Sequence, residues 1–374
     1  MAQTDVLVIG AGPAGLATSR ELARAGVGHT VLERGDAIAH TWTRLYDSLV
    51  LHTGKHLSAL PGLPYPAATP LFPTRANFIE YLRTYASRFN VPVETRADVS
   101  AIARDGNAWI VRTADGTARH ARALVVATGV VANPFVPELP NRAAFRGPVI
   151  HSVDYRRPEE ARGRRIAIVG AGNSAGEIAA ELGQAGAHVT LAVRSGAAIV
   201  PRQLFGVPIQ YVSFLLSPLP RAVQRTIALS LGVVAGRVRG SAVLPPPGRS
   251  PCPKIPLIGL HLADAIKAGR VRVRGAVDAF TATGMRFADG SDEDFDRIIL
   301  ATGYRAALAP LGRLVHIDAC GFACRRHRVE SLDQPGVYFV GHTYDTRGAI
   351  YNIGRDARRA AAGISAYLRQ PPRA

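Results

Sequence analysis

Two glycine-rich segments carry residue types at the spacing that binds a pyrophosphate. Gly10-Ala11-Gly12-Pro13-Ala14-Gly15 follows the apolar run 6–9, and Gly170-Ala171-Gly172-Asn173-Ser174-Ala175 follows 166–169. In such a segment the first glycine makes a tight turn and the second lets the backbone approach the phosphates, which face the N–H groups of the following helix. One copy is a weak signal. Two copies, each between a β-branched strand and an Ala-rich helix, predict a chain that holds two dinucleotides and passes a hydride between them.

The residue that ends the second strand of the first unit predicts the nucleotide bound there. Glu33 follows the strand 29–32, where a carboxylate accepts hydrogen bonds from both hydroxyls of a ribose. This position predicts an ADP half without a 2′-phosphate.

The second unit differs at the corresponding place. Aligning Gly26 with Gly186 sets Val193 against Glu33, and Arg194 is then the next residue. A carboxylate there would repel a 2′-phosphate, whereas Arg194, helped by Ser195, can pair with one. We therefore expect NADP(H) rather than NAD(H) in the second site.

Charge and cysteine content narrow the classes of protein. The 374 residues include 45 Lys and Arg against 28 Asp and Glu, a formal net charge of +17. The basic residues are scattered, without a basic tail or a basic strip interleaved with aromatics, so we expect no nucleic-acid partner. Cys252, Cys320 and Cys324 form no CxxC pair, which disfavours a disulfide reductase and a metal site. The first strand is expected within five residues of Met1, so a cytoplasmic protein without a signal peptide is predicted.

Alternating strands and helices must position the two glycine segments. Residues 5–33 and 164–194 each predict a strand–helix–strand unit, and 77–89 has helical spacing. Residues 36–75 have little periodicity and suggest an irregular segment over a cofactor. Leu204–Gly236 is the most apolar long stretch, but prolines and arginines interrupt it, so we expect helices lining a site and no membrane span.

Motifs outside the glycine segments suggest a family. Phe145, Gly147, His151 and Tyr155 match the FxGxxxHxxx(Y/F) fingerprint of flavin-containing monooxygenases, the class B flavoprotein monooxygenases. Glu33 followed by Trp42 is similar to that family's acid-then-tryptophan segment. The chain also resembles the YUCCA-like indole-3-pyruvate monooxygenase subgroup at residues 46–52, 72–75, 172–174, 301–304 and 348–351. The resemblance covers nearly the whole chain, although residues 200–256 match only loosely.

The resemblance implies a fold and its domain bounds. The expected class is α/β, with two Rossmann-like dinucleotide-binding domains of the three-layer ββα type found in glutathione reductase. The similar strand ends at 127–129 and 301–303 suggest that one domain is inserted into the other. We expect an FAD-binding domain at 1–150 and 285–374, and an NADPH-binding domain at 151–284.

The resemblance also implies an activity. FAD would occupy the first site and NADPH the second, in a monooxygenase that activates molecular oxygen as a flavin C4a-hydroperoxide. Its small-molecule substrate would be an aryl-pyruvate-like 2-oxo acid that undergoes oxidative decarboxylation. Two alternatives stay open: N- or S-oxygenation of a soft nucleophile, and an uncoupled NADPH oxidase or redox-responsive flavoprotein. A monomer or a homodimer is expected.

Site residues follow in part from the motifs and in part from the resemblance. The catalytic candidates are His52, Asn173 and Lys55. His52 stands where animal-type members have Asn. A substrate carboxylate would need a cation, for which Lys55, His56, Lys254 and Arg347 are candidates. The expected cofactor-binding residues are Gly10, Gly12, Pro13, Ala14, Gly15, Glu33, Arg34, Trp42, Thr128, Gly129, His151, Gly170, Gly172, Asn173, Ser174, Arg194, Ser195, Thr302, Gly303 and Tyr304. Apolar side chains such as Leu51, Phe72, Phe205 and Phe214 are expected to exclude water.

Overall fold

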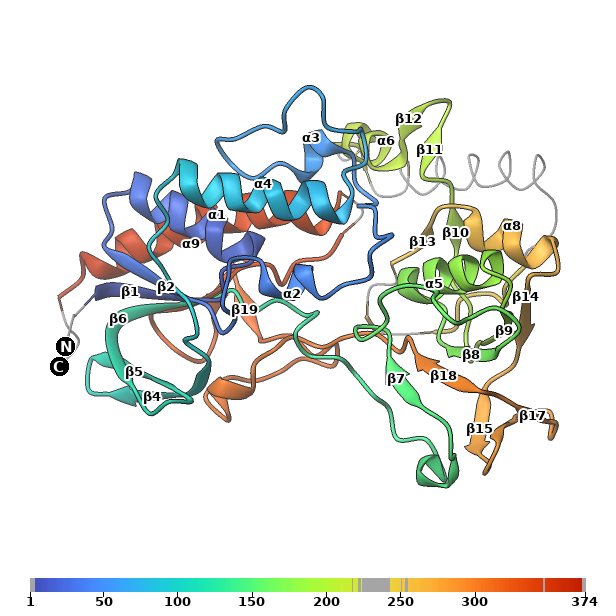
Figure 1. Ribbon diagram of the computed structural model, residues 1–374. Helices are drawn as coiled ribbons and strands as arrows, with labels where there is room; N and C mark the ends of the chain where they lie inside the picture. Colours follow the sequence, from blue (N-terminus) through green and yellow to red (C-terminus); the bar gives the residue numbers. More distant parts are fainter. Residues whose placement is uncertain are drawn as a thin grey trace. The chain divides into compact units, whose positions relative to one another are not determined.

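The chain forms two α/β units in the computed structural model (Figure 1). The structure describes residues 4–216, 218–220, 223, 243–249, 251–252, 255–345 and 347–371. The first unit combines Met1–Asn133 with Tyr304–Ala374, and the second is Pro134–Gly303. The second unit is therefore inserted into the first.

The unit bounds differ from the expected divisions at 150/151 and 284/285. Strands β7 (Val149–His151) and β18 (Arg297–Leu300) belong to the sheet of the second unit, where β18 pairs in parallel with both β7 and β8 (Arg165–Val169). The short β7 is the first strand of the inserted unit, and β18 is its last. The neighbours with which such short strands pair depend on tertiary contacts. The sequence motifs therefore could not locate the unit bounds.

A mixed sheet of nine strands forms the first unit. Its parallel part has the order β3-β2-β1-β6-β21, and antiparallel strands extend it beyond β6 and β21. The strands are β1 (Thr4–Ile9), β2 (His29–Leu32), β3 (Val93–Glu94), β4 (Val99–Asp105), β5 (Ala108–Thr113), β6 (Ala118–Val126), β19 (Arg325–Arg326), β20 (Glu330–Ser331) and β21 (Val337–Phe339).

Three layers of the first unit follow from the alternation of side chains along β1. Val6 and Val8 belong to the core beneath the long helices, whereas Leu7 and Ile9 belong to the core that contains Trp109 of β5. Neighbouring residues of a strand point to opposite faces, so the apolar residues 6–9 of β1 are buried on both sides. The helices are α1 (Pro13–Arg24), α2 (His40–Thr43), α3 (Lys55–Ser58), α4 (Arg75–Arg88), η2 (Ala309–Leu311) and α9 (Ala349–Leu368).

Helix α4 begins two residues before the expected start at 77. The Thr74 hydroxyl accepts a hydrogen bond from the Asn77 N–H at 3.2 Å, and the Asn77 side chain accepts one from the Thr74 N–H at 3.2 Å. This reciprocal capping satisfies N–H groups of the first turn, so the helix extends back to Arg75.

A five-stranded parallel sheet forms the centre of the second unit, in the order β14-β9-β8-β18-β7. Helix α5 packs near it, and a three-stranded antiparallel sheet (β15 to β17) follows β14 along the chain. The further elements are η1 (Arg142–Ala144), α5 (Asn173–Gln184), β9 (His188–Ala192), β10 (Ile199–Val200), β11 (Gln203–Leu204), β12 (Val207–Pro208), α6 (Ile209–Leu216), β13 (Leu257–Ile258), α8 (His261–Lys267), β14 (Val271–Arg274), β15 (Val277–Phe280), β16 (Gly284–Phe287) and β17 (Asp292–Asp294).

Candidate cofactor sites

Both glycine segments lie where an open parallel sheet binds ligands. In the first unit the strand order reverses between β1 and β6, and in the second between β8 and β18. Ligands of such sheets bind outside the carboxyl ends of the strands at this switch point. Gly10 follows β1 and Gly170 follows β8, so each segment is at its unit's switch point.

The first glycine of each segment is required by a close approach to the neighbouring strand end. Gly10 has φ +104°, and a Cβ there would lie 2.7 Å from the carbonyl oxygen of Ala127. Gly170 has φ +133°, and its Cβ would lie 2.3 Å from the carbonyl oxygen of Ala301. Each glycine thus fits only as glycine, beneath the strand that ends in Ala-Thr-Gly.

The second glycine of each segment faces open space. A Cβ on Gly12 or Gly172 would meet no described atom within 4 Å. These residues precede α1 and α5, and within the described chain no side chain caps either helix start. Free N–H groups and the positive end of the helix dipole therefore face a space that accepts phosphate. The residues present fit a dinucleotide in both units.

Backbone hydrogen bonds confirm the residue equivalence proposed between the two units. Gly10 N–H donates to Leu32 at 2.7 Å, as Gly170 N–H donates to Ala192 at 3.0 Å. The next residues, Glu33 and Val193, each donate to the neighbouring strand segment, at 2.8 and 3.0 Å. Val193 therefore occupies the position of Glu33.

The Glu33 carboxylate is held rigidly at the end of β2. It is 6% exposed and accepts the Ala11 N–H at 2.8 Å on Oε2 and the Gly35 N–H at 2.9 Å on Oε1. A carboxylate offers about four lone-pair positions, so each oxygen keeps capacity for a hydroxyl donor. The position next to the glycine segment is suited to a ribose.

Arg194 and Ser195 are exposed at the end of β9, where a phosphate can reach them. Gly196, the next residue, is buried beneath the Pro-rich segment 243–249. A Cβ on Gly196 would lie 1.6 Å from the carbonyl oxygen of Pro245. The sequence analysis missed this contact, because nothing in the spacing links residues so far apart.

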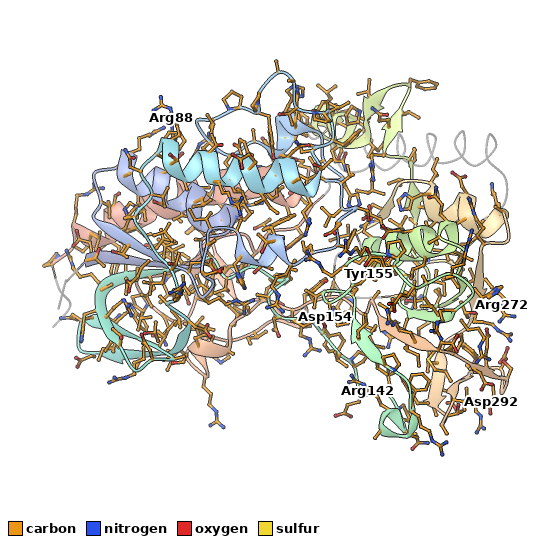
Figure 2. The ribbon with its side chains drawn as sticks, viewed as in Figure 1. Arg88, Arg142, Asp154, Tyr155, Arg272 and Asp292 are labelled. Atoms are coloured by element: carbon orange, nitrogen blue, oxygen red, sulfur yellow. The ribbon has the colours of Figure 1, made fainter. Side chains whose placement is uncertain are left out.

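The fingerprint residues serve the architecture of the second unit. The Phe145 ring covers Gly147, where a Cβ would lie 2.5 Å from the ring. The Tyr155 hydroxyl donates to Glu181 of α5 at 2.8 Å, and burial raises the pKa of Tyr155 above its usual range. Figure 2 marks Tyr155 near α5. These contacts fix the chain leading into β8.

His151 is a neutral, buried member of the same fingerprint. Its Nδ1 accepts the Val153 N–H at 3.2 Å, so Nε2 carries the proton and donates it to the Gly303 carbonyl oxygen, with the two heavy atoms 3.2 Å apart. Burial lowers the pKa of His151. The imidazole thus joins the end of β7 to the turn after β18, and this geometry suits positioning better than proton transfer.

Asn173 uses both ends of its side-chain amide on the backbone. Nδ2 donates to Pro256 at 3.2 Å, and Oδ1 accepts the Ile258 N–H at 2.8 Å. Leu257 packs on Gly176, where a Cβ would lie 2.6 Å from its side chain. Asn173 therefore holds β13 against the start of α5, and the catalytic role expected for it stays a prediction.

The two Ala-Thr-Gly strand ends are joined to the passages between the units. The Thr128 hydroxyl donates to Ala307 at 2.7 Å, and Gly129 accepts the Ala307 N–H. The Thr302 hydroxyl donates to Phe135 at 2.5 Å, and Gly303 accepts the Phe135 N–H. These residues build the turns beside Gly10 and Gly170.

Lys55 holds a loop through its ammonium group. Its ammonium group donates to the carbonyl oxygens of Thr69 at 2.7 Å, Ala67 at 2.8 Å and Pro66 at 3.4 Å. Because an ammonium group has three donors, these contacts satisfy it. The catalytic role expected for Lys55 stays a prediction beside this structural one.

The other predicted residues of the first unit lie on the irregular segment and its neighbours. Trp42 packs edge-on against Phe78, with ring centroids 4.5 Å apart. His52 is half-buried beside Thr53, and a Cβ on Gly348 would lie 2.8 Å from the Thr53 hydroxyl. The His52 segment therefore touches the start of α9. Arg34 is exposed and Tyr304 half-buried.

The remaining cations proposed for a substrate carboxylate lie in different environments. Arg347 is paired with Asp345, and His56 is exposed. Lys254 lies outside the described residues, as does most of 217–242. Leu51 is buried as expected, but Phe205 is 91% exposed, so its predicted part in excluding water is wrong.

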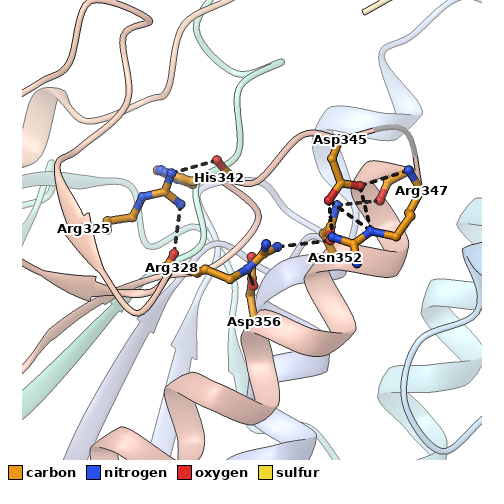
Figure 3. Close-up of polar contacts among 8 residues, drawn as sticks. Arg325, Arg328, His342, Asp345, Arg347, Asn352 and Asp356 are labelled. Carbon is orange, nitrogen blue, oxygen red and sulfur yellow. Dashed lines mark hydrogen bonds and ion pairs between the residues drawn. The ribbon is translucent and has the colours of Figure 1, made fainter. Parts of the chain in front are cut away.

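A polar cluster fixes the start of α9 (Figure 3). Arg328 donates to Asp356 and to Asn352, each at 3.1 Å, and Arg325 donates to the His342 carbonyl oxygen at 3.1 Å. The His342 side chain is 2% exposed, and within the described residues neither ring nitrogen has a hydrogen-bond partner. Burial, aided by Arg325, lowers the pKa of His342 to about 3.

The described residues contain no group of three or more His, Cys, Asp or Glu that could hold a metal ion. None of the helices in this part of the chain is both long and apolar enough to span a bilayer.

Comparisons with known proteins identify the family. Residues 3–318 match the family model described as flavin-binding monooxygenase-like. Indole-3-pyruvate monooxygenase YUCCA1 from Oryza sativa subsp. japonica is 38% identical over 98% of this chain and 93% of its own. A probable indole-3-pyruvate monooxygenase YUCCA1 from Arabidopsis thaliana is 36% identical over 80% of this chain and 75% of its own.

A solved structure agrees with these relatives. The flavin-containing monooxygenase from Stenotrophomonas maltophilia superposes with a TM-score of 0.79 at 26% identity, covering 98% of this chain and all of that one. The predicted two-domain α/β fold is confirmed. The chain therefore belongs to the flavin-binding monooxygenase-like family, in its YUCCA-like subgroup, and is a monooxygenase that uses FAD and NADPH.

Proposed function

We propose that this enzyme converts an aryl-pyruvate-like 2-oxo acid, with indole-3-pyruvate as the leading candidate, into the corresponding arylacetic acid. The observation that carries the proposal is the 38% identity, over 98% of the chain, to a protein named indole-3-pyruvate monooxygenase. The relative is matched over 93% of its own length, so both dinucleotide units and the segments between them are included.

We assign one cofactor to each unit, and the geometry of the two sites supports this proposal. We place FAD in the first unit, with its pyrophosphate at Gly12 and α1 and a ribose on Glu33. The support is the open space at Gly12 and the fixed carboxylate of Glu33. The other residues assigned to this site are Gly10, Pro13, Ala14, Gly15, Arg34, Trp42, Thr128 and Gly129.

NADPH is placed in the second unit, with its pyrophosphate at Gly172 and α5. Its 2′-phosphate lies on Arg194 and Ser195, which are exposed where the first unit has its acid. A guanidinium pairs well with phosphate oxygens, and the absent carboxylate removes the repulsion. The other residues assigned here are His151, Gly170, Asn173, Ser174, Thr302, Gly303 and Tyr304.

The protein's own part in the reaction is to bind, to orient and to hold the turns rigid. FAD held at Gly12 and Glu33 would supply the hydride acceptor for NADPH and the centre that activates oxygen. His151 fixes the turn at Gly303 with a neutral imidazole, and Asn173 keeps β13 on α5. A neutral His151 offers no acidic proton near neutral pH, which suits chemistry that stray protons would divert. We propose that His52, on the segment that touches α9, lies beside the flavin.

The proposed reaction balances without a further reactant. The 2-oxo acid, O2, NADPH and one proton give the arylacetate, CO2, NADP⁺ and water. One oxygen atom enters the new carboxylate as the bond between the keto carbon and the carboxylate carbon breaks. The other oxygen atom leaves as water.

Product analysis with a substrate panel tests the proposal. The holoenzyme is incubated with NADPH, oxygen and either indole-3-pyruvate or a soft amine or sulfide nucleophile. Catalase is added because free hydrogen peroxide decarboxylates 2-oxo acids without an enzyme. We expect indole-3-acetate by mass spectrometry in amounts that follow NADPH consumption. Oxygenated amine or sulfide in its place would reject the 2-oxo acid.

A further inference from the structure

The β11–β12 hairpin presents an aromatic side chain to solvent at its apex. Phe205 and Gly206 connect the two strands, with φ +50° and +79°, which are the left-handed values of a type I′ turn. Such turns favour Asn-Gly, and a bulky residue there is strained. Phe205 is also 91% exposed. The sequence thus keeps a large apolar side chain at a position that favours a small polar one.

Helix α6 follows this hairpin and has an inverted distribution of side chains. Gln210 is its buried residue, at 3% exposure, whereas Phe214 is 39% and Leu215 73% exposed. A surface helix normally buries its apolar stripe and exposes its polar face. We call Phe205, Val207, Phe214 and Leu215 the apolar tip.

The apolar tip belongs to a concentration of exposed apolar side chains. Six of the ten large hydrophobic side chains exposed in the described part of the chain lie between residues 205 and 223. Isolated exposed hydrophobics are ordinary, but a contiguous group marks a surface that contacts another phase or molecule.

The charge of the surrounding sequence identifies what that surface contacts. No Asp or Glu occurs between Glu181 and Asp264. The same stretch contains only positive formal charges, on Arg194, Arg202, Arg221, Arg225, Arg237, Arg239, Arg249 and Lys254. A stretch of sequence whose formal charges are all positive, and which includes the exposed Phe205 and Leu215, complements an anionic apolar boundary.

We propose that the apolar tip docks the enzyme on the surface of an anionic lipid bilayer. Phe205 and Leu215 enter the boundary between headgroups and acyl chains, and the basic residues of 182–263 contribute attraction to the headgroups. A protruding side chain enters a soft bilayer without a preformed pocket, which favours lipid over a protein partner. Docking is peripheral, because no described helix could span the bilayer.

Vesicle flotation of the full-length holoenzyme tests this proposal. The vesicles are phosphatidylcholine alone, or phosphatidylcholine with about one third phosphatidylglycerol. We expect binding to the anionic vesicles at low salt and a loss of binding as salt rises. The double variant Phe205→Ser/Leu215→Ser should lower the partition coefficient at least about 10-fold, since both side chains lose their apolar burial.

Matched controls come from the first unit. Ile317 is 54% and Leu332 is 55% exposed, so Ile317→Ser and Leu332→Ser remove comparable apolar surface elsewhere. Both should bind vesicles as the wild type does. Absence of wild-type binding at low salt, or an equal loss in the controls, would overturn the proposal. So would a tip variant that changes the oligomeric state and leaves flotation unchanged, because the tip would then contact a second copy.

A fluorescent variant keeps the test independent of folding defects. Phe205→Trp retains an aromatic ring at the apex, and Trp42 and Trp109 supply a background that the wild type measures. On anionic vesicles we expect a blue shift of the added emission and quenching by lipids with brominated acyl chains. An unshifted, unquenched Trp at position 205 on vesicle-bound protein would contradict insertion.

Discussion

The two nucleotide sites differ in residue type at one equivalent position. Glu33 and Val193 make equivalent backbone hydrogen bonds at the ends of β2 and β9. A buried carboxylate at one and an exposed guanidinium beside the other have opposite preferences for a ribose hydroxyl and a phosphate. We therefore propose that cofactor choice is a local electrostatic property of these strand ends.

Replacing Arg194 with Ala should affect NADPH much more than NADH. A charge-assisted hydrogen bond contributes about 1.5–3 kcal/mol, so the KM for NADPH should rise about 10- to 100-fold, and that for NADH less than about 3-fold. Initial-rate kinetics with both nucleotides measure the ratio. Arg142→Ala, at an exposed arginine of the same unit, is the control. Equal rises for the two nucleotides would refute the assignment of the phosphate to Arg194.

His342 gives the fold a predictable dependence on pH. Its pKa is lowered from 6.5 to about 3, chiefly by burial. As pH falls below 6.5 the unfolded chain takes up the proton first, so stability is complete above that value and declines towards pH 3. The slope per proton is about 1.4 kcal/mol per pH unit. We expect His342→Phe, which suits the neighbouring Phe322 and Phe339, to flatten the curve of unfolding free energy between pH 6.5 and 4.5. An unchanged slope in denaturant titrations would contradict this.

At the scale of elements, a side chain that the sequence suggests for substrate binding holds a loop in place. Lys55 lies beside His52, and a basic residue next to a catalytic candidate suggests a substrate contact. The structure instead gives its ammonium group three backbone carbonyls on 66–69. Carbonyl acceptors carry no mark in the sequence, so this role could not be predicted from it.

Lys55→Met should therefore lower stability and spare substrate binding. Loss of the carbonyl contacts should reduce the free energy of unfolding by about 1–3 kcal/mol and change the KM for the 2-oxo acid less than about 3-fold. Chemical denaturation and steady-state kinetics measure the two quantities. A large rise in KM at unchanged stability would restore Lys55 as a substrate ligand. His56→Gln, at an exposed neighbour, provides the reference.

Gly196 tests whether the Pro-rich segment supports the second site. Its missing Cβ would lie 1.6 Å from the Pro245 carbonyl oxygen, so Gly196→Ala must displace segment 243–249 or the Arg194 loop. We expect the KM for NADPH to rise at least about 5-fold, with flavin content unchanged. Gly275→Ala is the matched control, because a Cβ there meets no described atom within 4 Å and its φ is not positive. Equal effects of the two substitutions would argue against the contact.

For the whole molecule, the paired glycine segments and the fingerprint predicted the fold class, and the similar strand ends at 127–129 and 301–303 predicted the insertion of one unit into another. They succeed because strand, turn and helix are encoded within about 30 contiguous residues of each unit. The unit bounds and the exposure of Phe205 were not predicted. Both depend on contacts between residues that are far apart in the sequence. An example is the pairing of β18 with β7 and with β8.

The insertion gives the two nucleotides separate scaffolds within one chain. Each unit has its own parallel sheet, switch point and uncapped helix start, so the sites are built independently. A chain of this kind must transfer reducing equivalents from NADPH to the flavin and then to oxygen. The family membership makes this enzyme a monooxygenase, and product yield reports whether the two units act together on a 2-oxo acid.

The most direct measurement is the yield of indole-3-acetate per NADPH consumed, under ¹⁸O2 and with catalase present. Oxidative decarboxylation predicts a ratio near one and a single ¹⁸O atom in the product carboxylate, because one oxygen atom enters the acid and the other forms water. NADPH consumption without labelled indole-3-acetate would contradict it.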